Sequence, residues 1–184
     1  MRVITGKARG RRLETLTGED VRPTADRIKE AIFSALQFEI EGRLFLDLFA
    51  GSGQMGIEAL SRGAAGAVFV DESRESAGVV RKNLQSTGLM ENASVMNMDS
   101  IGFLKMKSGK FDIAFLDPPY RTGLLQKALE LVVGSVKKTG VIVCESPLDE
   151  ELPENCGDFT VDRTYRYGKI KVTMYRHKDM LTEE

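Results

Sequence analysis

The chain has 184 residues, of which 42% are hydrophobic, and its formal net charge at pH 7 is −1. This length is enough to bury the core of one domain, and the near-zero charge excludes a protein that is basic over its whole surface. The sequence shows no signal peptide and no apolar run long enough to cross a bilayer, and its two cysteines are not closely spaced. We therefore expect a cytoplasmic protein with free thiols.

Apolar and amphipathic segments alternate along most of the chain. The segments 2–5 and 11–16 are predicted to pair as a β-hairpin, with glycines in the connection between them. A helix is predicted to run from Thr24, as its N-cap, to about Phe38. Strands are then predicted at 43–48, 66–71, 93–97, 111–116 and 139–145, separated by helices at 54–62, 73–87, 99–106 and 122–135.

The last two predicted strands, at about 158–166 and 169–176, meet at a turn and should be antiparallel. Alternating strands and helices imply parallel pairing in the rest of the sheet. The predicted fold is α/β and Rossmann-like, with a mostly parallel seven-stranded sheet, a terminal antiparallel hairpin and a short N-terminal β-hairpin arm. We expect the arm at 1–20, the main domain at 21–177 and a disordered tail at 178–184.

A glycine-rich turn follows the first strand of the predicted sheet. It begins after Asp47 and contains Gly51, Gly53 and Gly56, which let the backbone turn sharply and approach a ligand. A strand, such a turn and a helix form the nucleotide-binding corner of a doubly wound sheet. With Asp71, twenty positions after Gly51, the glycines also fit a dinucleotide fingerprint. A glycine-rich turn without any ligand is the remaining alternative.

Two features favour S-adenosylmethionine over a nicotinamide or flavin dinucleotide. Asp47 lies just before the loop, where it would repel a pyrophosphate but attract a ligand that carries an ammonium and a sulfonium. A dinucleotide site also leaves the segment from Asp117 to Tyr120 unexplained. We therefore expect the methionine end of the cofactor near Asp47, its ribose on Asp71 and its methyl group facing Tyr120.

The segment Asp117-Pro118-Pro119-Tyr120 directly follows an apolar strand. The acid can accept a hydrogen bond from an amine, the prolines offer a rigid path without N–H groups, and the tyrosine ring can stack on a flat base. A turn that merely ends a strand is the alternative, because Asp and Pro are common in turns. We take these four residues as the candidate catalytic residues.

Acids follow several successive strands of the predicted sheet, at the edge where ligands bind in such folds. Because parallel strands deliver their carboxyl ends to one edge, we expect these acids to share a site. The candidate cofactor-binding residues are Asp47, Phe49, Ala50, Gly51, Ser52, Gly53, Asp71, Glu72, Asp99, Ser100 and Asp117.

Residues 1 to 12 carry no acid, and their cations are Arg2, Lys7, Arg9, Arg11 and Arg12. Such a cluster can neutralise several phosphates on a near-neutral protein, although a solvated basic terminus has the same composition. Arg22, Thr24 and Arg27 complete the candidate RNA-binding set, with a helix cap and surface charges as the alternative. Lys29 and Arg43 are expected to be solvated.

The combination of DLFAGSG with DPPY resembles the class I S-adenosylmethionine-dependent amino-methyltransferases. The segments RGRRL at 9–13 and RPTADR at 22–27 narrow the resemblance to the bacterial 16S rRNA guanine-N2 methyltransferases. It covers roughly residues 2 to 176 and departs at Gln54 and Met55, where smaller residues are expected. It implies S-adenosylmethionine as cofactor, Asp99 near the adenine, no metal, and 16S rRNA in an assembled or assembling small ribosomal subunit as partner.

The target amine is open on chemical grounds, because adenine N6 would suit Asp117 and Tyr120 as well as guanine N2. Enzymes that methylate glutamine usually carry Asn in place of Asp117, and the chain has no separate domain for recognising a DNA sequence. A noncatalytic nucleotide-binding or RNA-binding module is a third hypothesis. His177 is the only histidine, which argues against a histidine metal site or a Ser-His-Asp triad.

Overall fold

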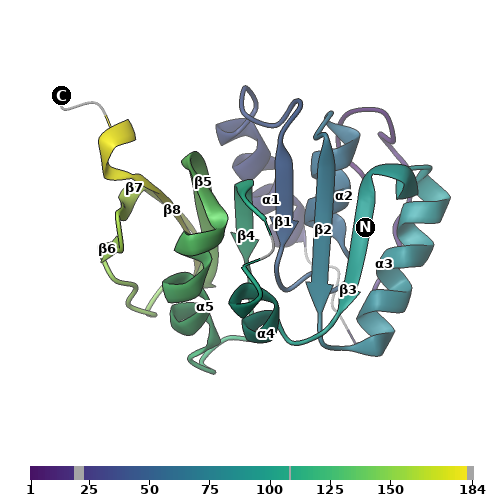
Figure 1. Ribbon diagram of the computed structural model, residues 1–184. Helices are drawn as coiled ribbons and strands as arrows, with labels where there is room; N and C mark the ends of the chain where they lie inside the picture. Colours follow the sequence, from purple (N-terminus) through teal and green to yellow (C-terminus); the bar gives the residue numbers. More distant parts are fainter. Residues whose placement is uncertain (19–22, 108, 182–184) are drawn as a thin grey trace.

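A twisted β-sheet crosses the middle of the protein, with helices on both of its faces (Figure 1). The computed structural model describes residues 1–18, 23–107 and 109–181, and in that part the sheet has eight strands in the order β3-β2-β1-β4-β5-β8-β7-β6. The strands are β1 Leu44–Asp47, β2 Gly66–Asp71, β3 Ala93–Asn97, β4 Phe111–Leu116, β5 Val136–Pro147, β6 Asn155–Cys156, β7 Phe159–Tyr167 and β8 Ile170–His177.

The sheet is parallel from β3 to β5 and antiparallel from β5 to β6, which confirms the predicted Rossmann-like α/β fold. One strand more than the predicted seven is present. The additional strand, β6, has only two residues, so it is too short to show a period of two in the sequence. The strand β4 is buried along its whole length, as expected for a central parallel strand covered on both faces.

The strand β5 is longer than its predicted range of 139–145, because it starts at Val136 and ends at Pro147. Its first residues include Lys137, Lys138 and Gly140, which are typical of a loop. The start of the strand is fixed by pairing between Val136 and Phe111. A Cβ on Gly140 would lie 2.7 Å from the carbonyl oxygen of Asp112, so this glycine permits the two backbones to approach.

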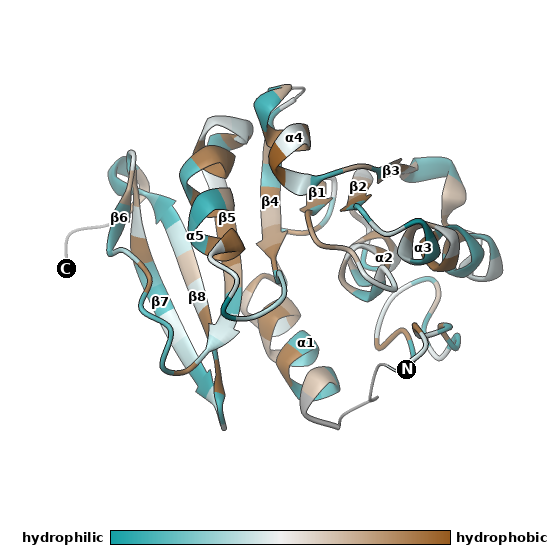
Figure 2. Cartoon of the chain, turned by 90° about the horizontal axis from the view of Figure 1, so that it is seen from below, coloured by the Kyte–Doolittle hydropathy of each residue, from teal (hydrophilic) through white to brown (hydrophobic). Residues whose placement is uncertain are grey.

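Helices cover the two faces of the sheet in separate groups, α1 to α3 on one face and α4 and α5 on the other (Figure 2). Successive strand residues point to opposite faces, so Phe45 packs with the first group and Leu46 with the second. The helices are α1 Pro23–Ala35, α2 Gln54–Ser61, α3 Arg74–Thr87, α4 Ser100–Lys105 and α5 Leu124–Val132, with 3-10 turns at Met90–Asn92, Val133–Ser135 and Lys178–Met180. In the described part of the chain, no helix is long and apolar enough to cross a bilayer.

The first helix, α1, begins and ends earlier than predicted. It starts at Pro23, which suits the first helical position because its fixed φ is helical and it needs no N–H partner. Thr24 therefore lies in the first turn of the helix and is not its N-cap, so that prediction was wrong. The helix ends at Ala35, and Phe38 lies beyond it with 92% of its surface exposed.

The N-terminal arm packs against α2, on the same side of the sheet as α1 (Figure 2). Its predicted hairpin is reduced to one antiparallel bridge between Arg2 and Arg12. Three apolar side chains of the arm, Val3, Ala8 and Leu13, are buried in the core. Hydrophobic burial therefore holds this basic segment against the core. Backbone hydrogen bonds join its two ends, among them the bond from the N–H of Val3 to the carbonyl of Arg11 at 3.0 Å.

Buried polar groups also fix the arm. The carboxylate of Glu58 on α2 accepts hydrogen bonds from the backbone N–H groups of Ile4 and Thr5, at 2.9 and 3.0 Å. Lys29 on α1 donates to the carbonyl oxygen of Arg2 at 2.9 Å and lies 3.7 Å from Glu58. Lys29 is only 1% exposed, so the expectation that it is solvated was wrong. Its burial lowers its pKa, which the nearby Glu58 carboxylate opposes.

The C-terminal segment forms a short 3-10 helix at Lys178–Met180, where we expected disorder from residue 178 onward. Two exposed ion pairs, each of 2.8 Å, accompany it: Lys178 with Asp158 and Asp179 with Lys138. The tail prediction was therefore wrong for this turn, and residues 182–184 lie outside the described part of the chain.

Candidate active site at the carboxyl edge of the sheet

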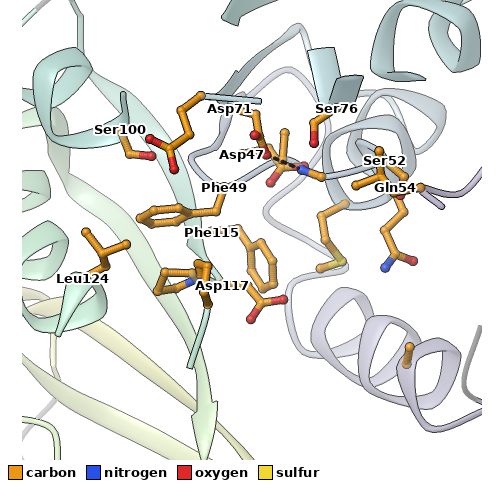
Figure 3. Close-up of a pocket in the computed structure, with 18 of the residues that line it drawn as sticks. Asp47, Phe49, Ser52, Gln54, Asp71, Ser76, Ser100, Phe115, Asp117 and Leu124 are labelled. Carbon is orange, nitrogen blue, oxygen red and sulfur yellow. Dashed lines mark hydrogen bonds between the residues drawn. The ribbon is translucent and has the colours of Figure 1, made fainter. Parts of the chain in front are cut away.

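A cavity of about 630 Å³ lies where the parallel strands end (Figure 3). Four acids at or just beyond the ends of β1, β2, β3 and β4, namely Asp47, Asp71, Asp99 and Asp117, all contribute to its wall. The crossing helices bring these acids together, although they are far apart in the sequence. The volume falls in the usual range of small-molecule sites, roughly 300–1,000 Å³.

Nearly all of the predicted site residues line this cavity. Those that do are Asp47, Phe49, Ala50, Gly51, Ser52, Asp71, Glu72, Asp99, Ser100, Asp117, Pro118, Pro119 and Tyr120. Gly53 does not: it precedes α2 with a φ of 80°, and a Cβ on it would lie 3.1 Å from Val80. Its position therefore serves the turn and the packing of α3, in a left-handed conformation that favours glycine.

The cavity also has walls that the sequence motifs did not indicate. The arm and the first turns of α1, α2 and α3 supply some of them, and β4 and α5 supply the others. The additional lining residues are Met1, Leu16, Gly18, Ala25, Asp26, Gln54, Met55, Ser76, Phe115 and Leu124. Gln54 and Met55 stood out only as departures from the family pattern. No sequence motif marked the arm residues, because they reach the cavity only through the packing of the arm on α2.

The glycine-rich turn is held by bonds to the neighbouring strand. The N–H of Ala50 donates to the carbonyl of Val70 at 3.0 Å, and the N–H of Gly51 donates to Asp71 at 2.9 Å. Gly56 lies in α2, where a Cβ would come within 2.3 Å of the Phe69 ring. The glycines thus serve the turn and the close packing of α2 on β2, as in nucleotide-binding folds.

Asp47 is a buried acid at the base of the cavity. It is 1% exposed, and its carboxylate accepts a hydrogen bond from the N–H of Gly56 at 3.0 Å (Figure 3). The pKa of Asp47 is raised to about 7, mainly by burial and to a smaller extent by the nearby Asp71, against the bond from Gly56. A buried acid of this kind is stabilised in its charged form when a cation binds beside it. The cavity therefore fits a ligand with a cationic group.

Asp71 and Asp99 also order the loops at the other strand ends. Asp71 accepts from the N–H groups of Gly51 and Ser73, both at 2.9 Å. Asp99 caps α4 by accepting from the N–H of Gly102 at 2.7 Å. These contacts hold both carboxylates at the edge of the cavity. Their expected contacts with the ribose and the adenine stay predictions.

The cavity has an apolar side and a polar side. Phe49 and Leu124 lie on one side and Ser52 and Gln54 on the opposite side, with Asp117 between them at the mouth (Figure 3). Aromatic and aliphatic side chains suit a flat heteroaromatic ring. The apolar side can therefore receive an adenine, and the polar side the amino-acid end of the same ligand.

The segment Asp117 to Tyr120 leaves β4 at the mouth of the cavity. Pro118 is buried, whereas 41% of the Tyr120 surface is exposed. The hydroxyl of Thr122 donates to the carbonyl of Pro119 at 2.8 Å, which closes the turn. The hydroxyl of Tyr120 donates to Glu145 on β5 at 2.9 Å, a contact that the sequence did not predict.

The candidate RNA-binding residues lie apart from this cavity. In the described part of the chain, Arg2, Lys7, Arg9, Arg11, Arg12 and Arg27 are all exposed, and none of them lines it. Arg22 lies outside the described residues, and the side chain of Thr24 is likewise not described. Binding of RNA by this set stays a prediction.

The sheet order, the glycine-rich turn after β1 and the acidic proline motif after β4 define a class I methyltransferase, the class whose members use S-adenosylmethionine. The model of the family described as Conserved hypothetical protein 95 matches residues 1–176. The chain belongs to this family, which confirms the resemblance seen in the sequence.

Two relatives carry the name Ribosomal RNA small subunit methyltransferase D. The chain is 36% identical to the protein of Escherichia coli K12 over 180 residues, which cover 97% of this chain and 90% of the relative. It is 40% identical to the protein of Haemophilus influenzae over 184 residues, which cover 96% and 94%. The matches therefore extend over nearly the full length of both relatives.

A solved structure shares the fold at lower identity. It is the 16S rRNA N2 G1207 methyltransferase of Thermus thermophilus in complex with S-adenosylmethionine and guanosine, with a TM-score of 0.73. It is 24% identical to this chain, and the match covers 89% of this chain and 45% of that one. This likeness supports the class I fold of the catalytic domain.

Proposed function

We propose that the protein transfers a methyl group from S-adenosylmethionine to the exocyclic N2 of a guanine in 16S rRNA, within an assembled or assembling small ribosomal subunit. The observation that carries the proposal is the presence of Asp117, Pro118 and Tyr120 in the wall of the cavity that also contains Asp47. Asp117, which can accept a hydrogen bond from an amine, therefore lies in the same cavity as Asp47, which can attract a cationic methyl donor. The names of the two relatives support ribosomal RNA as the substrate.

The amine of guanine is a poor nucleophile, because its lone pair is delocalised into the ring. Hydrogen bonds from N2–H to the Asp117 carboxylate and the Pro118 carbonyl would hold the nitrogen and favour its pyramidal form. Tyr120, which is exposed at the mouth, would stack on the base. S-adenosylmethionine would supply the methyl group from its sulfonium: the N–C bond forms as the C–S bond breaks, neutral S-adenosylhomocysteine leaves, and the nitrogen releases one proton. Alignment of nitrogen, carbon and sulfur can contribute ~7–11 kcal/mol.

The target base must leave its stack to reach Asp117, as it does in other enzymes that act on a base. Unstacking costs least where the base is already unpaired, which favours a loop of the RNA. The buried wall formed by Pro118 and Phe115 would then keep water from the reacting nitrogen.

We propose that the basic arm binds the phosphate backbone of the RNA. Loss of two phosphate contacts, as in the double substitution Arg11→Ala and Arg12→Ala, should reduce the slope of log affinity against log salt by about 1.4–1.8. The pair Lys105→Ala and Lys127→Ala is the control, because it removes the same charge from exposed positions on α4 and α5. An equal change in both variants would show that charge alone, and not the arm, governs binding.

The test of the proposed reaction is methyl transfer from radiolabelled S-adenosylmethionine to small ribosomal subunits from a strain that lacks this protein. We expect label in N2-methylguanosine. Label in N6-methyladenosine would retain the chemistry but overturn the substrate. Absence of label in RNA, with the cofactor still bound, would refute the proposal and direct the search to DNA and protein substrates.

The role of Asp117 is tested in the same assay. Asp117→Ala should abolish transfer and leave the affinity for S-adenosylmethionine nearly unchanged, as measured by calorimetry. Asp158→Ala is the matched control, because Asp158 is exposed and pairs with Lys178, away from the cavity. Parallel loss of cofactor binding and transfer in Asp117→Ala would contradict the assigned role.

A further inference from the structure

Glu145 lies beside the candidate catalytic segment but belongs to the next strand. The strands β4 and β5 pair in parallel, and Leu116 faces Cys144 at the end of their register. One residue further along each strand stand Asp117 and Glu145. Two acids therefore occupy neighbouring positions at the carboxyl edge of the sheet, and only the first of them belongs to a sequence motif.

The side chain of Glu145 accepts the hydrogen bond from the Tyr120 hydroxyl at 2.9 Å. Glu145 is half-buried on a strand, whereas Tyr120 lies in an irregular segment with 41% of its surface exposed. A side chain on a rigid strand can fix a group on a loop, because the strand does not move with it. Burial raises the pKa of Glu145, and the bond from Tyr120 opposes this shift.

The backbone of the same segment is held separately. Arg121, with a φ of 60°, pairs with Asp149 at 3.3 Å, and both side chains are exposed. An exposed pair of this kind contributes little. The hydroxyl of Tyr120, which is bonded to Glu145 on β5, is therefore held more firmly than the exposed side chain of Arg121.

We propose that Glu145 is a positioning residue, which fixes the orientation of the Tyr120 ring for stacking of the target base. This proposal rests on the proposed function, since it assigns the stacking partner to a nucleic-acid base. A ring that is ordered before the substrate arrives loses less side-chain entropy on binding. Ordering one flexible side chain corresponds to about a 3- to 10-fold change in affinity.

The test compares Tyr120→Phe, Glu145→Met, Glu145→Gln and the double variant Tyr120→Phe with Glu145→Met. We expect Glu145→Met to raise KM for the RNA about 3- to 10-fold, with kcat and the affinity for S-adenosylmethionine nearly unchanged, and Tyr120→Phe to raise KM by a similar factor. The double variant should match the single ones, because both changes remove one interaction. Glu145→Gln, which keeps an acceptor oxygen, should restore most of the wild-type KM.

Glu151→Met is the matched control, because Glu151 is an exposed acid in the segment that follows β5. The positioning role would be overturned if the increase in KM in the double variant equalled the product of the two single increases, or if KM were unchanged in Glu145→Met. A lower melting temperature without a change in KM would indicate a structural role only.

A measurement on the free protein keeps this inference separate from the proposed function. The NMR order parameter of the Tyr120 ring should fall in Glu145→Met and be retained in Glu145→Gln. An unchanged order parameter in Glu145→Met refutes the positioning role, whether or not the wild type methylates RNA. If the wild type transfers no methyl group but Glu145→Met shows the expected loss of ring order, only the proposed function is refuted.

Discussion

Replacement of Asp47 by Asn should make the cofactor-free protein more stable than the wild type at high pH. The carboxylate is 1% exposed, and burial raises its pKa from 3.8 to about 7. The pKa of Asp47 is higher in the folded protein than in the unfolded chain. Its contribution to the free energy of unfolding is therefore fully present below pH 3.8 and is lost as the pH rises through 7. Asn keeps an oxygen for the Gly56 bond and has no charge to desolvate.

The size of the effect follows from the two pKa values of Asp47. Between pH 5 and pH 8, the wild type should lose about 2.5 kcal/mol of unfolding free energy through this group, at 1.36 kcal/mol per unit of pKa shift. For a domain of this size, this corresponds to a difference of roughly 5–10 °C in Tm. Asp47→Asn should not show this loss.

The assay is urea unfolding of the wild type and Asp47→Asn without cofactor, at pH 5 and pH 8. All other titrating groups are common to the two proteins, so the difference between them isolates Asp47. A difference in stability that stays constant with pH would refute the reasoning. S-adenosylmethionine should reverse the preference, because a cation beside the ionised Asp47 stabilises the wild type and cannot do so in Asp47→Asn.

Three further substitutions test the packing around the site. Gly56→Ala places a Cβ 2.3 Å from the Phe69 ring, so chemical denaturation should show a loss of about 1–3 kcal/mol. Gly78→Ala in α3 meets no atom within 4 Å and should instead gain up to about 1 kcal/mol; a gain in both variants would contradict the packing argument. Glu58→Ala leaves Lys29 buried without its counter-charge, so it should cost about 3–5 kcal/mol and accelerate amide exchange in the arm; unchanged exchange there would refute the anchoring role.

The sequence determined the parallel part of the sheet. Strands such as β2 and β4 are short apolar runs bounded by glycine, aspartate or proline, and these signals are local in the chain. The turn after Asp47 and the segment after β4 were identifiable for the same reason. Their meeting in one cavity follows from the rule that parallel strands open at a common edge.

The tertiary structure decided which polar side chains are buried and what they contact. Lys29 has the composition of a surface residue, and it is buried because α1 and α2 bring it 3.7 Å from Glu58. The partner of Tyr120 is Glu145, which is 25 residues away on a neighbouring strand. Periodicity and turn chemistry describe neighbours along the chain, whereas such contacts depend on strand order and on how helices cross the sheet. They therefore become visible only once the chain is folded.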